Sequence, residues 1–195
     1  MREYHPAAVY APCDDLWIVT TYYNPAGYRT KRENYARFAA PLRAAGIPLV
    51  TVECAFGAEP FELAASPHVI QVRARNVMWV KERLINLAIA RLPDHVTKVA
   101  WLDADILFTN AAWAQQTSAL LDRWPLAQPH DRVGRMALGQ LTFAGASRHR
   151  PAGDPGRGSA AALILRRPGG FCRAVTPRDA ELMALWHRSG ETRGS

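Results

Sequence analysis

The segment KVAWLDADILFTN, residues 98–110, constrains the fold more than any other part of the sequence. Its run from Val99 to Leu102 is apolar on both faces, which is typical of a central strand in a parallel sheet covered by helices. Asp103 and Asp105 follow at the carboxyl end of that strand, where open α/β sheets bind ligands. In extended backbone the two carboxylates would point to the same side and could share one divalent cation. The segment therefore predicts an α/β fold and a metal site at Asp103 and Asp105, although acidic pairs after strands also serve as turn formers and helix caps.

The length and charge of the chain limit the alternatives. A chain of 195 residues suits a single α/β domain with one sizeable core. The formal charge of +7 is compatible with phosphorylated small molecules, nucleic acid or anionic membrane as partners. Most of the excess lies after Gly139, where nine arginines stand against four acidic residues. The net charge alone does not indicate which of these partners the protein binds. The sequence contains no motif specific for nucleic-acid binding.

Neither the cysteines nor the apolar runs indicate a secreted or membrane protein. Cys13, Cys54 and Cys172 are far apart and have no CxxC spacing, which favours neither a zinc site nor a disulfide framework. The N-terminal segment lacks the apolar core of a signal peptide, and no run approaches the ~18 apolar residues of a membrane span. We therefore expect a cytoplasmic protein with no transmembrane segment.

Three regions are expected along the chain: an N-terminal extension at residues 1–15, an α/β domain at 16–131, and a poorly defined basic region at 132–195. The α/β domain is predicted to hold a mostly parallel, Rossmann-like sheet flanked by helices. Its expected strands are Leu16–Thr21, Pro48–Glu53, His68–Val72, the run before Asp103, and Pro125–His130. Its expected helices are residues 29–46 with a kink or break at Pro41, Met78–Leu92, and Ala111–Trp124 with Asn110 as N-cap. Cys54–Pro67 is expected to be a loop.

The periodic pattern weakens beyond Asp131. Only Ala160–Leu165 reads as a strand or helix fragment, and a capped helix is expected to start near Thr176. The Arg, Pro, Gly and Ala content of this region fits either a real subdomain or a frameshifted reading of GC-rich DNA. We expect the fold to be incomplete or irregular here.

Polar residues at the ends of the expected strands predict a binding site. Thr21, Glu53 and Asp103 end parallel strands, so they should meet at one edge of the sheet. Tyr22 and Tyr23 could offer a ring face to a nucleobase and a hydroxyl to a ribose or phosphate, or they could pack beneath the next helix. Glu53 occupies the position of the second-strand acid that binds ribose hydroxyls in dinucleotide folds. No G-x-G-x-x-G or Walker loop is present, however, which argues against a conventional dinucleotide or P-loop site.

The helix before the aspartates carries basic residues that could neutralise phosphate. Lys81 is the main candidate for a point charge on a diphosphate, with Arg75 and Arg83 nearby in sequence. The simpler interpretation is that all three side chains are solvated on the protein surface and bind nothing. Without a glycine-rich cradle, a cation on Asp103 and Asp105 is the available means of holding a diphosphate.

Three segments in this order resemble the GT-A fold glycosyltransferases: Trp17–Pro25 (WIVTTYYNP), Val77–Ala88 (VMWVKERLINLA) and the DxD-like Asp103-Ala104-Asp105. The resemblance covers about Leu16 to His130. It implies a nucleotide-sugar donor with Mn²⁺ or Mg²⁺. It also implies that Thr21 and the two tyrosines after it border the nucleotide, while the two aspartates meet ribose, metal and diphosphate. The family's acceptor-binding residues and catalytic base find no match after Asp131, so the catalytic residue stays unknown.

The resulting hypothesis is a metal-dependent glycosyltransferase, complete or truncated, that moves a sugar to an acceptor hydroxyl on a glycan, lipid or small molecule. One alternative is a nucleotidyltransferase, against which the lack of a glycine-rich basic phosphate loop counts. The other is a non-catalytic remnant whose basic tail binds nucleic acid or anionic surfaces nonspecifically.

Overall fold

A mostly parallel sheet forms the centre of the protein. The structure is a computed structural model, and it describes residues 3–77, 81–124, 126–130, 134, 143–144 and 163–166. The sheet has the order β4-β3-β2-β5-β8-β6. Its parallel strands are β2 (Leu16–Tyr22), β3 (Leu49–Phe56), β4 (Val69–Ala74) and β5 (Lys98–Trp101). Two antiparallel pairings, of β8 (Leu163–Arg166) with β5 and with β6 (Leu126–Ala127), complete it. The predicted α/β class with a mostly parallel sheet is confirmed.

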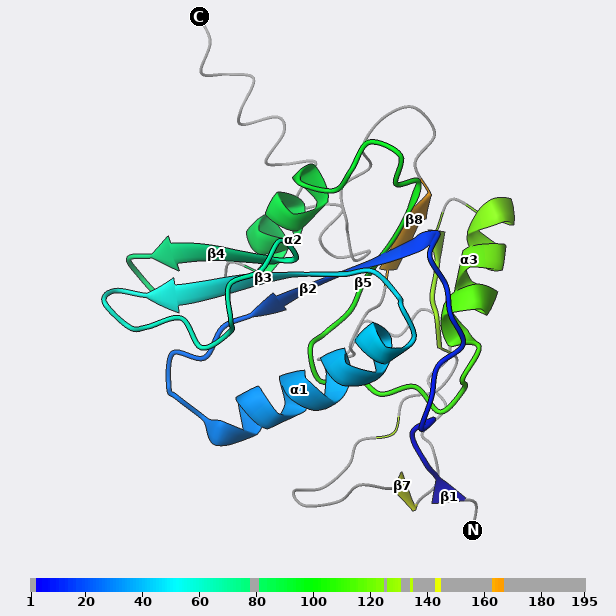
Figure 1. The fold of residues 1–195 in the computed structure, drawn as a ribbon, viewed down its shortest axis with the longest axis horizontal. Helices are drawn as coiled ribbons and strands as arrows, with labels where there is room; N and C mark the ends of the chain where they lie inside the picture. The colour runs from blue at the N-terminus through cyan, green and yellow to red at the C-terminus, as the bar shows by residue number, and fades with distance from the viewer. Residues whose placement is uncertain are drawn as a thin grey trace, which may run out of the picture.

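Three helices of the described residues cover the two faces of the sheet. They are α1 (Arg29–Ala44), α2 (Lys81–Ala90) and α3 (Trp113–Arg123). Figure 1 shows α1 and α2 on opposite sides of the strands. Phe38 of α1 and Trp113 of α3 belong to one hydrophobic core with the Leu16 face of β2, whereas Leu84 of α2 belongs to a second core with Val52 of β3. A separate short pair is formed by β1 (Glu3–Tyr4) and β7 (Phe143–Ala144).

The path of the chain explains why α1 and α2 lie on opposite faces. From β2 the chain passes through α1 to β3 and then to β4, moving outward on one side of β2. It then returns through α2 and enters the sheet at β5, on the other side of β2. Right-handed crossovers in opposite directions put their helices on opposite faces. The strand order therefore reverses between β2 and β5, and the crevice beyond their carboxyl ends is the topological switch point where such sheets bind ligands.

The N-terminal segment, which the sequence set apart as an extension, packs against the domain. Tyr10 is 3% exposed and its hydroxyl accepts a hydrogen bond from the Phe108 N–H at 3.1 Å. Asp15 accepts hydrogen bonds from the buried Lys98 ammonium at 2.8 Å and from the Ser118 hydroxyl at 2.6 Å. These contacts tie residues before β2 to β5, α3 and the loop between them.

Several predicted elements differ from the structure in detail. Pro41 does not break α1, because helix residues on both sides of it, such as Phe38 and Leu42, bury against the sheet. Cys54–Phe56, expected in a loop, continues β3, where every residue is buried. Helix α3 begins at Trp113 instead of Ala111, and its N-cap is Ala112 instead of the predicted Asn110. The Asn110 carboxamide oxygen accepts the Ala112 N–H at 3.0 Å and closes a turn before the helix.

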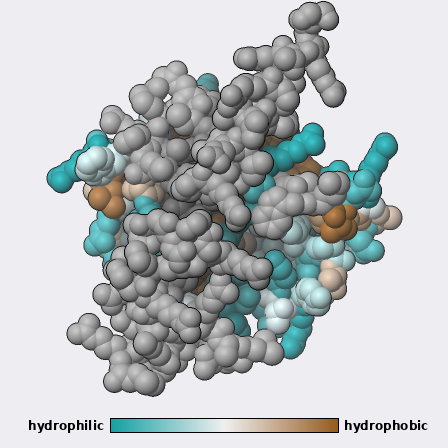
Figure 2. All heavy atoms as spheres, turned by 180° about the vertical axis from the view of Figure 1, so that it is seen from behind, coloured by the Kyte–Doolittle hydropathy of each residue, from teal (hydrophilic) through white to brown (hydrophobic). Residues whose placement is uncertain are grey.

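The remaining predictions concern the chain after α3 and its surroundings. Within the described part of the strand expected at Pro125–His130, Leu126–Ala127 is a strand and residues 128–130 are not. Within the described part of the fragment expected at Ala160–Leu165, residues from Leu163 belong to the strand Leu163–Arg166. The start of the helix predicted from Met78 and the helix near Thr176 lie outside the described residues. No helix in the described part of the chain is long and apolar enough to cross a membrane. Seen from behind, the visible surface of the described residues is mostly hydrophilic, with small hydrophobic patches (Figure 2).

Candidate functional site at the carboxyl edge of the sheet

Hydrogen bonds between β2 and the end of β5 fix the position of Asp103 and Asp105, called the acidic doublet below. The Leu102 N–H donates to the Val19 carbonyl at 3.0 Å, and the Thr20 hydroxyl donates to the Leu102 carbonyl at 2.7 Å. Thr20 and Leu102 are 1% and 2% exposed, so both bonds are sheltered from water. Asp103 therefore follows a residue that is held firmly in place, and it lies at the switch point between β2 and β5.

The doublet lies in a turn instead of an extended strand, which corrects the geometry expected from the sequence. β5 ends at Trp101, and Ala104 and Asp105 form a turn in which the Ile106 N–H approaches the Asp103 carbonyl at 3.4 Å. Asp103 is half-buried and Asp105 is exposed. The two carboxylates are close in the chain but do not project as neighbours on one face of a strand.

Lys81, the first residue of α2, forms an ion pair with Asp103. The Lys81 ammonium bonds to Oδ1 of Asp103, and the side chains are only 21% and 29% exposed. The structure thus brings together two predicted site residues that are 22 positions apart in sequence. This pair, with Tyr23 and the adjacent Asp105, is called the Lys81–Asp103 corner below.

Tyr23 completes the corner from the end of β2. Its ring packs against the α2 core. Burial raises the pKa of the Tyr23 hydroxyl, the nearby Asp103 charge raises it further, and the Lys81 charge lowers it. The Lys31 ammonium lies 5.5 Å from the centre of the Tyr23 ring, in the geometry of a cation–π contact. Lys31 was not singled out from the sequence, because nothing in its local pattern distinguishes it from other helix-surface lysines.

Tyr22 faces the opposite side of the sheet from Tyr23, as the alternation of side chains along a strand requires. It is 3% exposed, belongs to the α1 core, and its hydroxyl donates to Oε2 of Glu62. Burial, followed by the hydrogen bond to the Glu62 carboxylate, raises the pKa of Tyr22 above its usual value. Thr21 comes directly before the two tyrosines and is half-buried. The predicted trio at the end of β2 is therefore divided between two faces.

Glu53 holds the loop between β3 and β4. It is 2% exposed, and its Oε1 accepts the backbone N–H groups of Glu62 and Leu63, the latter at 3.1 Å. Its Oε2 accepts a hydrogen bond from the Gln71 carboxamide at 3.1 Å, and the same Gln71 nitrogen donates to the Leu63 carbonyl at 2.9 Å. These bonds satisfy polar groups of a parallel crossover that has no helix of its own. The predicted ribose contact of Glu53 stays a prediction, and both of its oxygens already have protein partners.

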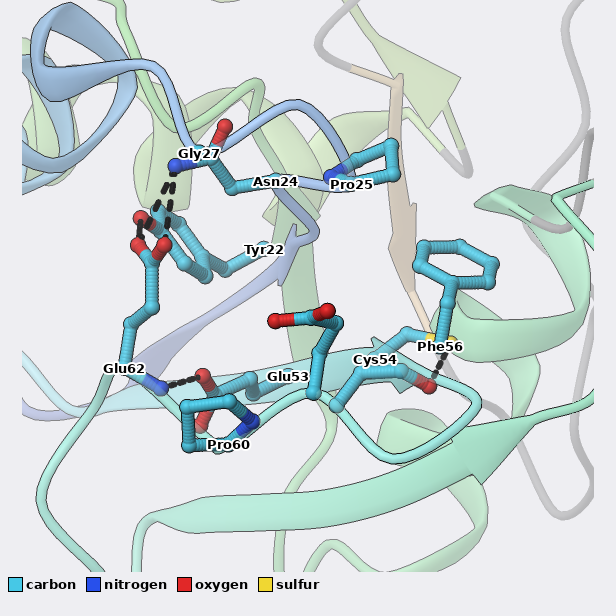
Figure 3. Close-up of a pocket in the computed structure, with 11 residues that line it drawn as sticks. Tyr22, Asn24, Pro25, Gly27, Glu53, Cys54, Phe56, Pro60 and Glu62 are labelled. Carbon is cyan, nitrogen blue, oxygen red and sulfur yellow. Dashed lines mark hydrogen bonds between the residues drawn. The ribbon is translucent and has the colours of Figure 1, made fainter.

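An open pocket lies beside Glu53 on the α1 side of the sheet, and its space together with the solvent at its mouth amounts to about 480 Å³. Figure 3 shows the Glu62 side chain directed toward Tyr22 and Asn24, while its backbone nitrogen meets Glu53. The Asn24 carboxamide donates to the two Glu62 oxygens at 3.0 and 3.2 Å. The lining residues are Tyr22, Asn24, Pro25, Gly27, Glu53, Cys54, Ala55, Phe56, Glu59, Pro60 and Glu62. Glu62 was missed from the sequence because it lies in a loop without periodicity.

The donor chemistry of the corner suits a divalent cation that shares its ligands with a substrate. Within the described part of the chain, no group of three or more His, Cys, Asp or Glu side chains could hold a metal ion. Asp103 and Asp105 supply two carboxylates and thus hard oxygen ligands. Mg²⁺ is commonly bound in this way, by one or two carboxylates together with water and substrate phosphates. By ligand type these carboxylates suit a Mg²⁺ or Mn²⁺ that takes further ligands from a substrate, and the described residues do not form a complete metal cage.

Comparisons with protein-family models, with curated proteins and with solved structures find no match to this chain.

Proposed function

We propose that the chain is a GT-A-like, metal-dependent glycosyltransferase that uses a nucleotide-diphosphate sugar as donor. The observation that carries the proposal is the meeting of Tyr23, Lys81 and Asp103 at the switch point between β2 and β5. A ligand site at this position is expected for an open α/β sheet, and carboxylates beside a lysine suit a diphosphate with its cation. The likeness of the three sequence segments to GT-A enzymes points to the same chemistry.

In the proposed reaction, the acceptor hydroxyl oxygen forms a bond to the anomeric carbon of the sugar while the bond to the diphosphate breaks. Negative charge develops on the departing diphosphate, and a divalent cation bound there would stabilise that charge. Asp103 and Asp105 would hold the cation, Lys81 would contribute a second positive charge, and Tyr23 would border the nucleotide. The acceptor proton must pass to a base, and no described residue is assigned that role.

Titration of nucleoside diphosphates by calorimetry, with and without Mn²⁺ and at two salt concentrations, tests the proposal. Binding should require Mn²⁺ and should be lost in both Asp103→Asn and Asp105→Asn. Asp94→Asn is the matched control, because Asp94 is an exposed carboxylate before β5, at the other end of that strand. Unchanged affinity in both corner variants would refute the proposal.

The same experiment separates the alternatives. A basic remnant predicts binding to polyanions that weakens steeply with salt and does not need Mn²⁺. A nucleotidyltransferase would release pyrophosphate from a nucleoside triphosphate. A glycosyltransferase would instead release a nucleoside diphosphate from the sugar donor.

A further inference from the structure

The ion pair at the corner joins the Lys81 ammonium to the carboxylate that the proposed cation needs. Lys81 bonds to Oδ1 of Asp103, and both side chains are mostly sheltered from water. A pair in this environment is screened less than a surface pair, so its charges act strongly on any third ion nearby. A divalent cation approaching Asp103 would meet the positive charge of Lys81 at the same oxygen.

The Lys81 side chain is sheltered, at 21% exposed, although it belongs to the first described turn of α2. Arg83, two residues later on the same helix, is exposed to solvent, as is usual for a basic helix residue. The burial of Lys81 is thus tied to its contact with Asp103.

We propose, on the basis of the proposed function, that Lys81 is an internal counter-ion that competes with the divalent cation for Asp103 and transfers to the donor diphosphate when the donor binds. The four-carbon stem of lysine allows its ammonium to change partners without movement of the helix. In the free protein, the Lys81 ammonium neutralises one of the two carboxylates, so the acidic doublet has the net charge of a single carboxylate. Cation alone therefore binds weakly, and diphosphate and cation bind cooperatively because the diphosphate removes the competing ammonium.

Binding of Mn²⁺ alone, followed by the electron paramagnetic resonance of the free ion, tests the competition directly. Lys81→Met removes the charge and keeps the stem, whereas Lys81→Arg keeps the charge. Arg83→Met is the control, since it removes a positive charge from an exposed position of the same helix. Lys81→Met should bind Mn²⁺ about tenfold more tightly than the wild-type chain, as expected from removing a unit charge near the ion. Lys81→Arg and Arg83→Met should remain within about twofold of wild type on the same grounds.

The wild-type chain provides a second measurement that does not depend on any substitution. A saturating nucleoside diphosphate should raise the affinity for Mn²⁺ by about tenfold, and Mn²⁺ should raise the nucleotide affinity by the same factor. This gain should shrink in Lys81→Met, in which no ammonium has to be displaced. Circular dichroism of each variant verifies the fold.

Each result decides the question. Equal Mn²⁺ affinity in Lys81→Met and wild type, independent binding of Mn²⁺ and nucleotide, or no Mn²⁺ binding by any variant would overturn the counter-ion role. The proposed function fails in a different way. In that case Lys81→Met binds Mn²⁺ more tightly than wild type, while neither wild type nor Arg83→Met binds a nucleoside diphosphate in its presence.

Discussion

Replacement of Glu53 by glutamine tests whether this buried carboxylate stabilises the loop between β3 and β4. Glutamine keeps an oxygen that can accept the Glu62 and Leu63 N–H groups, but those bonds lose the assistance of the negative charge. The new NH₂ group faces the Gln71 carboxamide, which donates to Oε2 of Glu53 at 3.1 Å in the wild-type chain. One hydrogen bond to a charged acceptor is lost, at a cost of roughly 1.5–3 kcal/mol.

Relief of the desolvation of the buried charge offsets part of that cost, so we expect Glu53→Gln to lower the free energy of unfolding by about 2 kcal/mol. For a chain of this size, that change lowers the melting temperature by roughly 4–8 °C. Urea denaturation followed by circular dichroism measures the change. Glu59→Gln, which alters an exposed carboxylate of the same loop, is the control and should stay within about 0.5 kcal/mol of wild type. A Glu53→Gln variant as stable as the control would refute the assigned role.

Two further predictions concern polar groups away from the corner. Desolvation raises the pKa of Asp15, but hydrogen bonds from Lys98, Ser118 and Cys13 outweigh it and lower the pKa from 3.8 to about 2. Because the folded-state pKa is below the unfolded value, this stabilisation is present above about pH 4 and is lost as the pH falls toward 2. The Asp15 side chain is 51% exposed, so solvent screening reduces this loss of unfolding free energy to about 1 kcal/mol. The urea midpoint of Asp15→Asn should therefore vary less between about pH 4 and pH 2 than that of wild type. Tyr22→Phe removes the hydroxyl that donates to Glu62 and should cost about 1 kcal/mol of unfolding free energy, measured in urea; a midpoint equal to that of wild type would contradict the hydrogen bond.

The main strands and their parallel orientation could be predicted because their signals are local. Val99–Leu102 is apolar on both faces, and Leu16–Thr21 is rich in β-branched and aromatic residues, so each segment indicates a buried strand by itself. The α2 stripe and its return to the sheet before Asp103 then place the two aspartates at a carboxyl edge. In the structure, Asp103 does lie just beyond the carboxyl end of β5.

Contacts between distant segments could not be predicted in the same way. The pairing of Lys81 with Asp103 depends on how α2 crosses the sheet, which the spacing of residues does not encode. The different sides taken by Tyr22 and Tyr23 follow from strand alternation, but only once β2 is known to extend through Tyr22. The hydrogen bonds of Glu53 to Glu62 and Leu63 depend on a loop that has no periodic pattern, so this structural role could not be predicted from the sequence.

The most direct test of the central claim is the position of Mn²⁺ in crystals grown with a nucleoside diphosphate, located by anomalous scattering. The account predicts an Mn²⁺ peak at coordination distance from carboxylate oxygens of Asp103 and Asp105, with the diphosphate bound to the same ion and the Lys81 ammonium turned toward it. A nucleotide bound elsewhere, or an Mn²⁺ peak away from the two carboxylates, would contradict the account.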